Sequence, residues 1–147
     1  MFHTPRVLIT DDDRDFRETI AGVLGERGFE TLQAGDGEEA LSIVRRQEVH
    51  LLLLDMQMPR LSGLETIERL REVSLSITAG SIALEAESMQ PIIPLPWILI
   101  SGCLDDQLIA RAKAAAVFSV LPKPVRLPAL TSAVAGALAQ AYDWRAA

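Results

Sequence analysis

The sequence is poor in the residues that form disulfides and bind soft metals. It holds a single cysteine, Cys103, and two histidines, His3 and His50. One cysteine cannot form an internal disulfide, and these three side chains are too few for a four-ligand structural zinc site. We therefore expect a chain that works in a reducing, cytoplasmic setting without structural zinc.

Long hydrophobic runs and an excess of positive charge are also missing. The longest apolar stretch, Pro91–Ile100, is broken by three prolines and is far shorter than a membrane span of roughly 20 residues. The N-terminal residues lack the features of a signal peptide, so we expect neither export nor membrane insertion. With 14 Lys and Arg against 20 Asp and Glu, the net charge of −6 would repel a phosphate backbone. Direct binding to nucleic acid is therefore not expected.

The 147 residues suit one domain, in which short apolar runs alternate with segments of helical periodicity. This alternation predicts an α/β fold, a doubly wound five-stranded parallel sheet with helices on both faces. Four runs are almost continuously apolar, as in strands covered on both faces, and the second is typical of an edge strand. The expected strands are Arg6–Thr10, Glu30–Ala34, Leu51–Asp55, Trp97–Ser101 and Val117–Leu121.

Helix starts are marked by capping residues. Asp13 is a candidate N-cap, and the pairs Asp36 with Glu39 and Ser62 with Glu65 have the spacing of an N-cap followed by an acidic residue three positions on. The first helix is expected to bury one apolar stripe. This stripe comprises Phe16, Ile20, Val23 and Leu24. The fourth helix is expected through Leu108–Ala112, and the fifth from Pro128 onward.

Chemically active side chains follow four of the five predicted strands. They are Asp11 and Asp12 after the first, Asp55 at the end of the third, Ser101 at the end of the fourth and Lys123 after the fifth. Because parallel strands end at the same end of the sheet, we expect these side chains to meet. Crowded carboxylates repel one another by on the order of 4 kcal/mol per pair near 4 Å. A hard cation with oxygen ligands relieves this repulsion, which predicts Mg²⁺, with Mn²⁺ as a substitute.

The same set of groups suits phosphoryl transfer onto a carboxylate. Asp55 is the natural acceptor, because a cation on one side can neutralise two phosphoryl oxygens. Ser101 and Lys123 can then address the remaining phosphoryl oxygen charge from the other side.

Four motifs together resemble those of the receiver domains of two-component response regulators, of the chemotaxis type. The motifs are Val-Leu-Ile-Thr-Asp-Asp-Asp (7–13), Leu-Leu-Leu-Leu-Asp-Met-Gln-Met-Pro-Arg-Leu-Ser-Gly (51–63), Ile-Leu-Ile-Ser-Gly (98–102) and Leu-Pro-Lys-Pro (121–124). The resemblance covers nearly the whole chain and implies a single receiver domain over residues 1–147 with a (βα)5, flavodoxin-like fold.

The resemblance also implies how the metal is held. Asp12 and Asp55 would ligate Mg²⁺ directly, Asp11 would act mainly through water, and the backbone carbonyl of Gln57 would supply another ligand. Gly63 would end the turn that follows the third strand.

For signalling, the resemblance implies phosphorylation of Asp55 by a sensor histidine kinase or a phosphotransfer protein. Ser101 would hydrogen-bond the phosphoryl group, Lys123 would pair with it, and the Lys123–Pro124 bond would be cis. Such a domain is a switch or a relay rather than an enzyme. Because only Tyr142–Ala147 follow the fifth helix, we expect a partner protein to read the face formed by the fourth helix, fifth strand and fifth helix.

Two features depart from the family pattern. Val120 stands where receivers usually carry a switch Tyr or Phe, and Phe118, expected on the same face, is a candidate substitute. The connection 74–96 is far longer than the usual 2–6 residues and is interpreted as an insertion, with a helical turn at Ile82–Met89. Its apolar content suggests a docking or homodimer surface.

Other functions remain as alternatives. A degenerate receiver that binds partners without being phosphorylated is suggested by Val120. A phosphohydrolase of the haloacid-dehalogenase type is disfavoured, because Met-Gln-Met follows Asp55 and leaves out the second, acid–base carboxylate. A flavodoxin-type flavin site is disfavoured by Asp11–Asp13, since a phosphate loop needs hydrogen-bond donors there.

Overall fold

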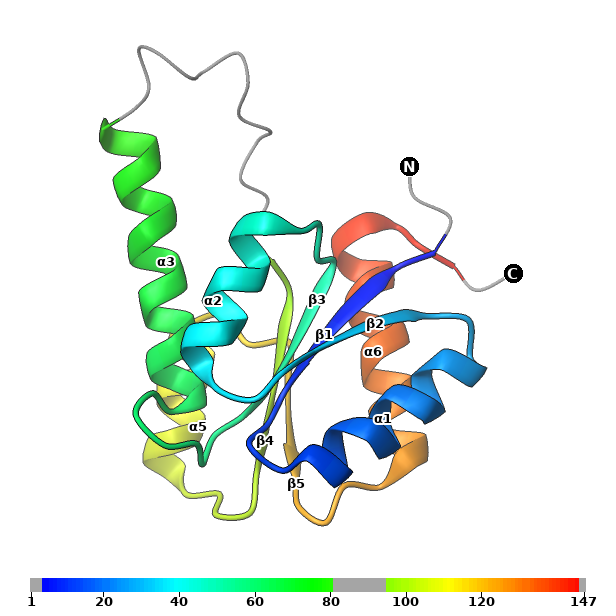
Figure 1. Ribbon diagram of the computed structural model, residues 1–147. Helices are drawn as coiled ribbons and strands as arrows, with labels where there is room; N and C mark the ends of the chain where they lie inside the picture. The colour runs from blue at the N-terminus through cyan, green and yellow to red at the C-terminus, as the bar shows by residue number, and fades with distance from the viewer. Residues whose placement is uncertain (1–3, 81–94, 146–147) are drawn as a thin grey trace.

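In the computed structural model, which describes residues 4–80 and 95–145, five parallel strands form one sheet (Figure 1). Their order is β2-β1-β3-β4-β5, so β2 lies at an edge as expected. The strands are β1 (Arg6–Thr10), β2 (Glu30–Ala34), β3 (Leu51–Asp55), β4 (Trp97–Ser101) and β5 (Ser119–Pro122). The order changes direction beside β1 and β3, which is where ligands bind in doubly wound folds.

Helices cover both faces of the sheet (Figure 1). In the described part of the chain they are α1 (Arg14–Glu26), α2 (Gly37–Arg46), α3 (Gly63–Gly80), α5 (Asp106–Ala114) and α6 (Leu127–Tyr142). Helices α1 and α6 pack on one face, and α2, α3 and α5 pack on the other. The predicted doubly wound α/β fold is therefore confirmed.

The predicted caps form at the helix starts. The Asp13 carboxylate accepts from the backbone N–H groups of Asp15 and Phe16 at the start of α1. At α3, Ser62 Oγ accepts from Glu65 N–H and Glu65 Oε1 accepts from Ser62 N–H, which is a reciprocal capping box. These bonds satisfy donors that have no partner within the helix.

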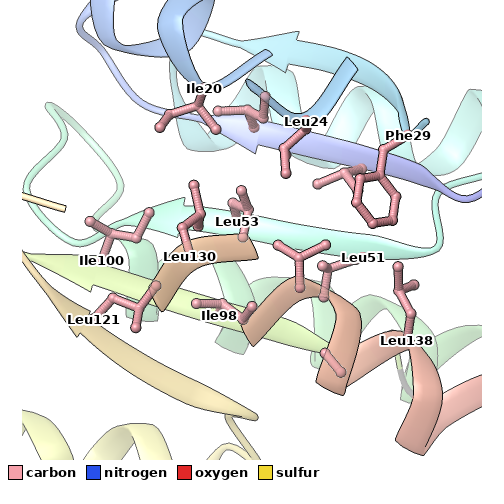
Figure 2. Packing of buried hydrophobic residues seen from close by; sticks show 14 residues of the cluster. Ile20, Leu24, Phe29, Leu51, Leu53, Ile98, Ile100, Leu121, Leu130 and Leu138 are labelled. Atoms are coloured by element: carbon pink, nitrogen blue, oxygen red, sulfur yellow. The ribbon is translucent and has the colours of Figure 1, made fainter. Parts of the chain in front are cut away.

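The core consists of two apolar layers, one on each face of the sheet. Alternate residues of β3 serve the two layers: Leu51 and Leu53 face α1 and α6, and Leu52 and Leu54 face the other helices. Figure 2 shows the first layer, in which Leu130 and Leu138 of α6 lie on the same face of the sheet as Ile20 and Leu24 of α1 and Phe29, which follows α1. All five residues of β3 and of β4 are buried, as expected of central strands.

Two elements, β5 and α3, differ from the sequence predictions in their bounds. Strand β5 begins at Ser119 rather than Val117 and ends at Pro122 rather than Leu121. Helix α3 continues to Gly80, so residues 74–80, expected in the long connection, are helical. No proline or glycine stands between Ser74 and Gly80, so nothing in this backbone interrupts the helix. The turn predicted at Ile82–Met89 lies outside the described residues.

None of the described helices combines enough length with enough apolar character to cross a membrane.

Candidate functional site

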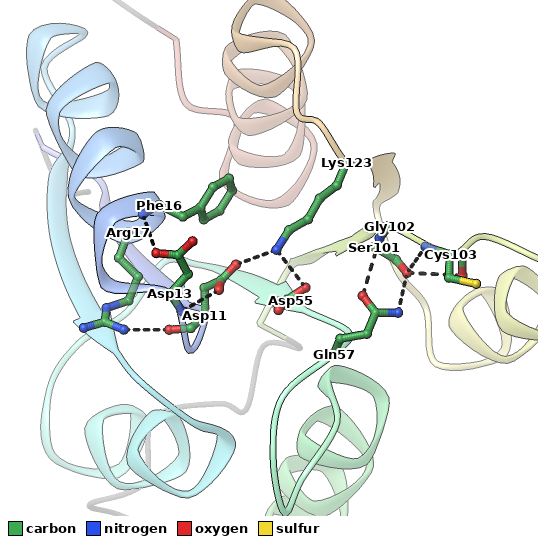
Figure 3. A network of polar contacts seen from close by, with 10 residues as sticks. All are labelled: Asp11, Asp13, Phe16, Arg17, Asp55, Gln57, Ser101, Gly102, Cys103 and Lys123. Carbon is green, nitrogen blue, oxygen red and sulfur yellow. Dashed lines mark hydrogen bonds and ion pairs between the residues drawn. The ribbon is translucent and has the colours of Figure 1, made fainter.

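The loops after β1, β3, β4 and β5 meet at the C-terminal end of the sheet, and they bring the predicted residues together (Figure 3). Asp11 and Asp55 are 1% and 2% exposed, and Ser101 is fully buried. Asp12 is exposed, yet carboxylate oxygens of Asp11, Asp12 and Asp55 lie within 4.8 Å of one another. The Lys123–Pro124 peptide bond is cis, as the resemblance implied.

Lys123 reaches across the site from the loop after β5. Its ammonium donates a hydrogen bond to Asp11 Oδ2 at 3.0 Å and lies 3.3 Å from Asp55 Oδ1. Burial alone would lower the pKa of Lys123, but the hydrogen bond to Asp11 and the charges of Asp11 and Asp55 outweigh it, so this pKa is raised. Lys123 therefore stays charged at neutral pH.

Asp55 is held under unfavourable electrostatic conditions. Its Oδ1 is buried and accepts no well-directed hydrogen bond from the part of the chain described here, although Lys123 lies at ion-pair distance. Burial and the neighbouring Asp11 carboxylate raise the pKa of Asp55 to about 6, against the opposing effect of Lys123. The charge of Lys123 thus offsets only part of the cost of burying the ionised Asp55 carboxylate beside Asp11.

The residues present fit a hard divalent cation. The donor set consists of three carboxylates with no histidine or thiol, and one carboxylate oxygen is buried without a hydrogen-bond partner among the described residues. Mg²⁺ prefers such oxygen ligands and keeps several waters, which the exposure of Asp12 permits.

Ser101 is engaged by neighbouring groups on the opposite side of Asp55 from Asp11 (Figure 3). Its Oγ accepts from Gln57 Nε2 at 3.0 Å and from Cys103 N–H at 3.1 Å, and it donates to the Cys103 carbonyl at 3.2 Å. Gln57 Oε1 also accepts from Gly102 N–H at 3.4 Å. The Gln57 amide thus covers a hydroxyl and a backbone donor that face the site.

Gly63 fixes the loop after β3, which carries Asp55 and Gln57. Its N–H donates to the carbonyl of Met56, which closes the turn. A Cβ at this position would lie 2.7 Å from the backbone oxygen of Asp55 and 3.0 Å from Leu99 Cδ1. Only glycine allows this close approach without movement of the backbone.

The expectation that Phe118 shares a face with Val120 is wrong. Phe118 packs with the α1 and α6 layer, where its ring would lie 3.2 Å from a Cβ on Gly136, whereas Val120 packs with the other layer. The reason is that β5 begins only at Ser119, so the alternation of a strand does not extend back to Phe118.

Sequence reasoning missed two side chains of this site. Gln57 was assigned only a backbone role, and Phe16 was assigned only to the apolar stripe of the first helix. The Phe16 ring lies next to Lys123, with the ammonium 4.8 Å from the ring centroid. The position of Gln57 two residues after Asp55 was the available signal for the first; nothing in the local pattern distinguishes Phe16 from a core residue.

A doubly wound sheet with acidic groups, a hydroxyl and an ammonium at its C-terminal end is the arrangement of a signalling receiver. The model of the response regulator receiver domain family matches residues 7–135. The chain belongs to this family and is a receiver domain of the two-component response regulator type, a class of signalling modules rather than metabolic enzymes.

Individual proteins support this assignment. The chain is 32% identical to the response regulator receiver protein Anae109_2439 of Anaeromyxobacter over 84% of its own length and 44% of that protein. It is 46% identical to response regulator MprA of Mycobacterium leprae over 74% of its own length and 50% of that protein. The chain thus spans half or less of these curated relatives. The structure of chemotaxis protein CheY4 of Vibrio cholerae shares the fold, with a TM-score of 0.75, 21% identity and coverage of 92% of this chain and all of that one.

Proposed function

We propose that this receiver accepts a phosphoryl group on Asp55, with Mg²⁺ bound by the neighbouring carboxylates, and thereby switches its binding to a partner protein. The observation that carries the proposal is the buried, under-compensated Asp55 carboxylate, 3.3 Å from the Lys123 ammonium and within 4.8 Å of two further carboxylates. We propose that residues 1–147 act as one domain in the cytoplasm, the setting that suits a single free thiol.

The transfer step uses a donor with a phosphorylated histidine. An Asp55 carboxylate oxygen attacks phosphorus, and the bond from phosphorus to the histidine nitrogen breaks. The electron pair of that bond stays with the imidazole nitrogen, which takes a proton, and Asp55 becomes an acyl phosphate. In this position Lys123 and Ser101 face the phosphoryl oxygens and offset their charge.

The carboxylates of Asp12 and Asp55 and the backbone carbonyl of Gln57 would hold the cation, with Asp11 acting mainly through water. When bound, Mg²⁺ supplies positive charge that neutralises phosphoryl oxygens. Lys123 can then leave Asp11 for the phosphoryl group, because the cation takes over the compensation of the acidic side chains. Mn²⁺ has the same ligand preference and can replace Mg²⁺.

The partners follow from this chemistry. A sensor histidine kinase or a phosphotransfer protein supplies the phosphoryl group, and a downstream protein reads the face formed by α5, β5 and α6, the fourth helix, fifth strand and fifth helix of the sequence prediction. Val120 lies on β5, where the family usually has an aromatic side chain. This departure favours one alternative, a receiver that binds its partner without being phosphorylated.

Intact mass after incubation with acetyl phosphate tests the proposal. We expect a gain of one phosphoryl group that requires Mg²⁺ or Mn²⁺ and is absent in Asp55→Asn. Asp13→Asn is the matched control, because it removes a carboxylate from the same loop while asparagine still caps α1. No gain in wild-type protein under any condition would instead favour the phosphorylation-independent alternative.

A further inference from the structure

Among the described residues, the Lys123 ammonium has an aromatic neighbour as well as acidic ones. The ammonium contacts Asp11 at 3.0 Å and Asp55 at 3.3 Å, and it lies over the ring of Phe16 at 4.8 Å from the centroid (Figure 3). This distance is within the range of about 6 Å at which an ammonium is attracted to the negative face of an aromatic ring. The side chain of Lys123 is 28% exposed, so solvent screens this attraction only in part.

The two acidic contacts change during the proposed cycle, whereas the aromatic contact does not. A cation held by Asp12 and Asp55, with Asp11 reached mainly through water, would compete with Lys123 for the charge of Asp11 and Asp55. A phosphoryl group on Asp55 converts that carboxylate into an acyl phosphate, which no longer carries the carboxylate charge. The Phe16 ring binds no metal and gains no charge. Its attraction for the ammonium therefore persists when the ion pairs are lost.

The position of the ring is set by the start of α1. Phe16 N–H donates to the Asp13 carboxylate at 3.2 Å, and the Phe16 side chain packs against the core layer beneath α1 and α6. The ring is thus held by the helix and the core rather than by the charged groups of the site.

From this geometry we propose that Phe16 is a positioning residue for phosphoryl transfer, which holds the Lys123 ammonium at the site by a cation–π contact while Asp11 and Asp55 exchange partners. This inference rests on the proposed function for its role in the reaction. The contact itself does not depend on phosphorylation, so it can be tested separately.

Site-specific fluorination of Phe16 is the sharpest test, because fluorine withdraws charge from the ring face while nearly preserving its shape. With one, two and three fluorines, we expect the rate of phosphorylation by acetyl phosphate to fall in steps, to about 2- to 5-fold below wild type. Phe16→Leu should show a similar loss, and Phe16→Tyr should retain the rate. Phe118, on the α6 side of the core, is the control position, where fluorination should change nothing.

A double-mutant cycle tests the contact without any phosphoryl donor. Phe16→Leu and Lys123→Met, singly and together, should show a coupling of about 2- to 5-fold in the equilibrium constant for unfolding. A phosphorylation rate that is flat across the fluorinated series, or a cycle without coupling, would overturn the role of Phe16. If wild-type protein is not phosphorylated while the coupling is present, the contact stands and the proposed function is what fails.

Discussion

At the N-terminal end of the sheet, His50 is buried with partners on both ring nitrogens, whereas at the C-terminal end Asp55 is buried beside another carboxylate. His50 Nδ1 accepts from Arg6 N–H at 2.9 Å, Nε2 lies 3.1 Å from Glu48 Oε1, and the His50 carbonyl accepts from Tyr142 O–H at 2.8 Å. Asp55 has a carboxylate oxygen without a hydrogen bond from the described residues and a pKa raised to about 6.

The difference separates a structural polar cluster from one prepared for a ligand. Buried polar groups are normally hydrogen-bonded, because an unmet group loses its hydration without replacement. The His50 cluster follows this rule and ties the end of α6 to β1 and β3. Asp55 is an exception to this rule. A cation, a proton or a phosphoryl group bound to its carboxylate would satisfy the oxygen that has no hydrogen bond. The N-terminal end of the sheet therefore contributes to stability, and the C-terminal end holds the groups that exchange ligands.

The largest effect is expected for Gly63→Ala at the C-terminal end. The added Cβ would lie 2.7 Å from the backbone oxygen of Asp55, so the loop must shift. We expect a loss of about 3 kcal/mol in unfolding free energy, together with slower phosphorylation. Gly22→Ala is the control: nothing lies within 4 Å of its Cβ, and alanine should raise stability slightly. Urea denaturation measures the unfolding free energy of both variants. Equal stability of Gly63→Ala and wild type would contradict the close contact.

At the N-terminal end, His50→Leu removes the acceptor of the Arg6 backbone N–H. We expect a loss of about 2 kcal/mol in unfolding free energy, because this donor is left unmet. The rate of phosphorylation by acetyl phosphate should be unchanged. His50→Asn, which can still accept a hydrogen bond, should recover part of the stability. A His50→Leu variant that folds stably but reacts slowly would break the proposed separation of the two ends.

A smaller effect is expected for Gln57→Ala, which uncovers Ser101 and Gly102 without changing the backbone carbonyl. Gln57 Oε1 accepts from Gly102 N–H, so without the amide this donor is available to a phosphoryl group, and Ser101 Oγ loses the Nε2 group that covers it. Phosphorylation should therefore become about 2- to 10-fold faster, the range of one neutral hydrogen bond. Gln107→Ala, an exposed glutamine on α5, serves as the control. Time-resolved intact mass measures both; a slower reaction in Gln57→Ala would mean that the amide assists the transfer.

The smallest effects concern pH and have opposite signs at the two ends. Burial lowers the pKa of His50 below 6.5, so the unfolded chain binds the proton more readily, and the His50 contribution to stability is lost as the pH falls below about 6.5. The pKa of Asp55 is raised from 3.8 to about 6, so the folded chain binds more protons between these values. The Asp55 contribution therefore grows as the pH falls from about 6 towards 4.

Unfolding free energies of wild type, His50→Asn and Asp55→Asn are measured across this pH range. The difference between the wild-type curve and each variant's curve gives the contribution of His50 or of Asp55. Curves that run parallel to wild type would show that neither side chain titrates differently on folding.

Much of this arrangement was predictable from the sequence. Four strands were placed at their observed bounds. Three of them, β1, β3 and β4, are central and read as continuous apolar runs, and the mixed polar and apolar run of β2 was interpreted as an edge strand. The capping pairs marked the starts of α2 and α3. The start of β5 was not predictable from apolarity, since Val117 and Phe118 are apolar but precede the strand. Ala116 directly before them has a φ of 60°, a turn conformation that alanine does not signal.

The site was predictable as far as topology determines it. Strand ends place Asp11, Asp55, Ser101 and Lys123 together, whatever the side-chain conformations. The Gln57 amide bond to Ser101 and the Phe16 ring beside Lys123 depend on the conformations that side chains adopt when distant segments meet. The spacing places Gln57 two residues after Asp55, near the site, but it does not determine which way the amide turns, and nothing in the local pattern distinguishes Phe16 from a core residue. The structure therefore supplied both contacts.

The central claim is that Asp55 is held at an electrostatic cost that a cation relieves, and unfolding free energies at pH 7.5 with and without Mg²⁺ test it most directly. The account predicts that, without Mg²⁺, Asp55→Asn is more stable than wild type by on the order of 1 kcal/mol, because asparagine removes the charge that burial and Asp11 disfavour. It also predicts that Mg²⁺ stabilises wild type and has little effect on the variant. A variant less stable than wild type without Mg²⁺, or stabilised by Mg²⁺ as much as wild type, would contradict the account.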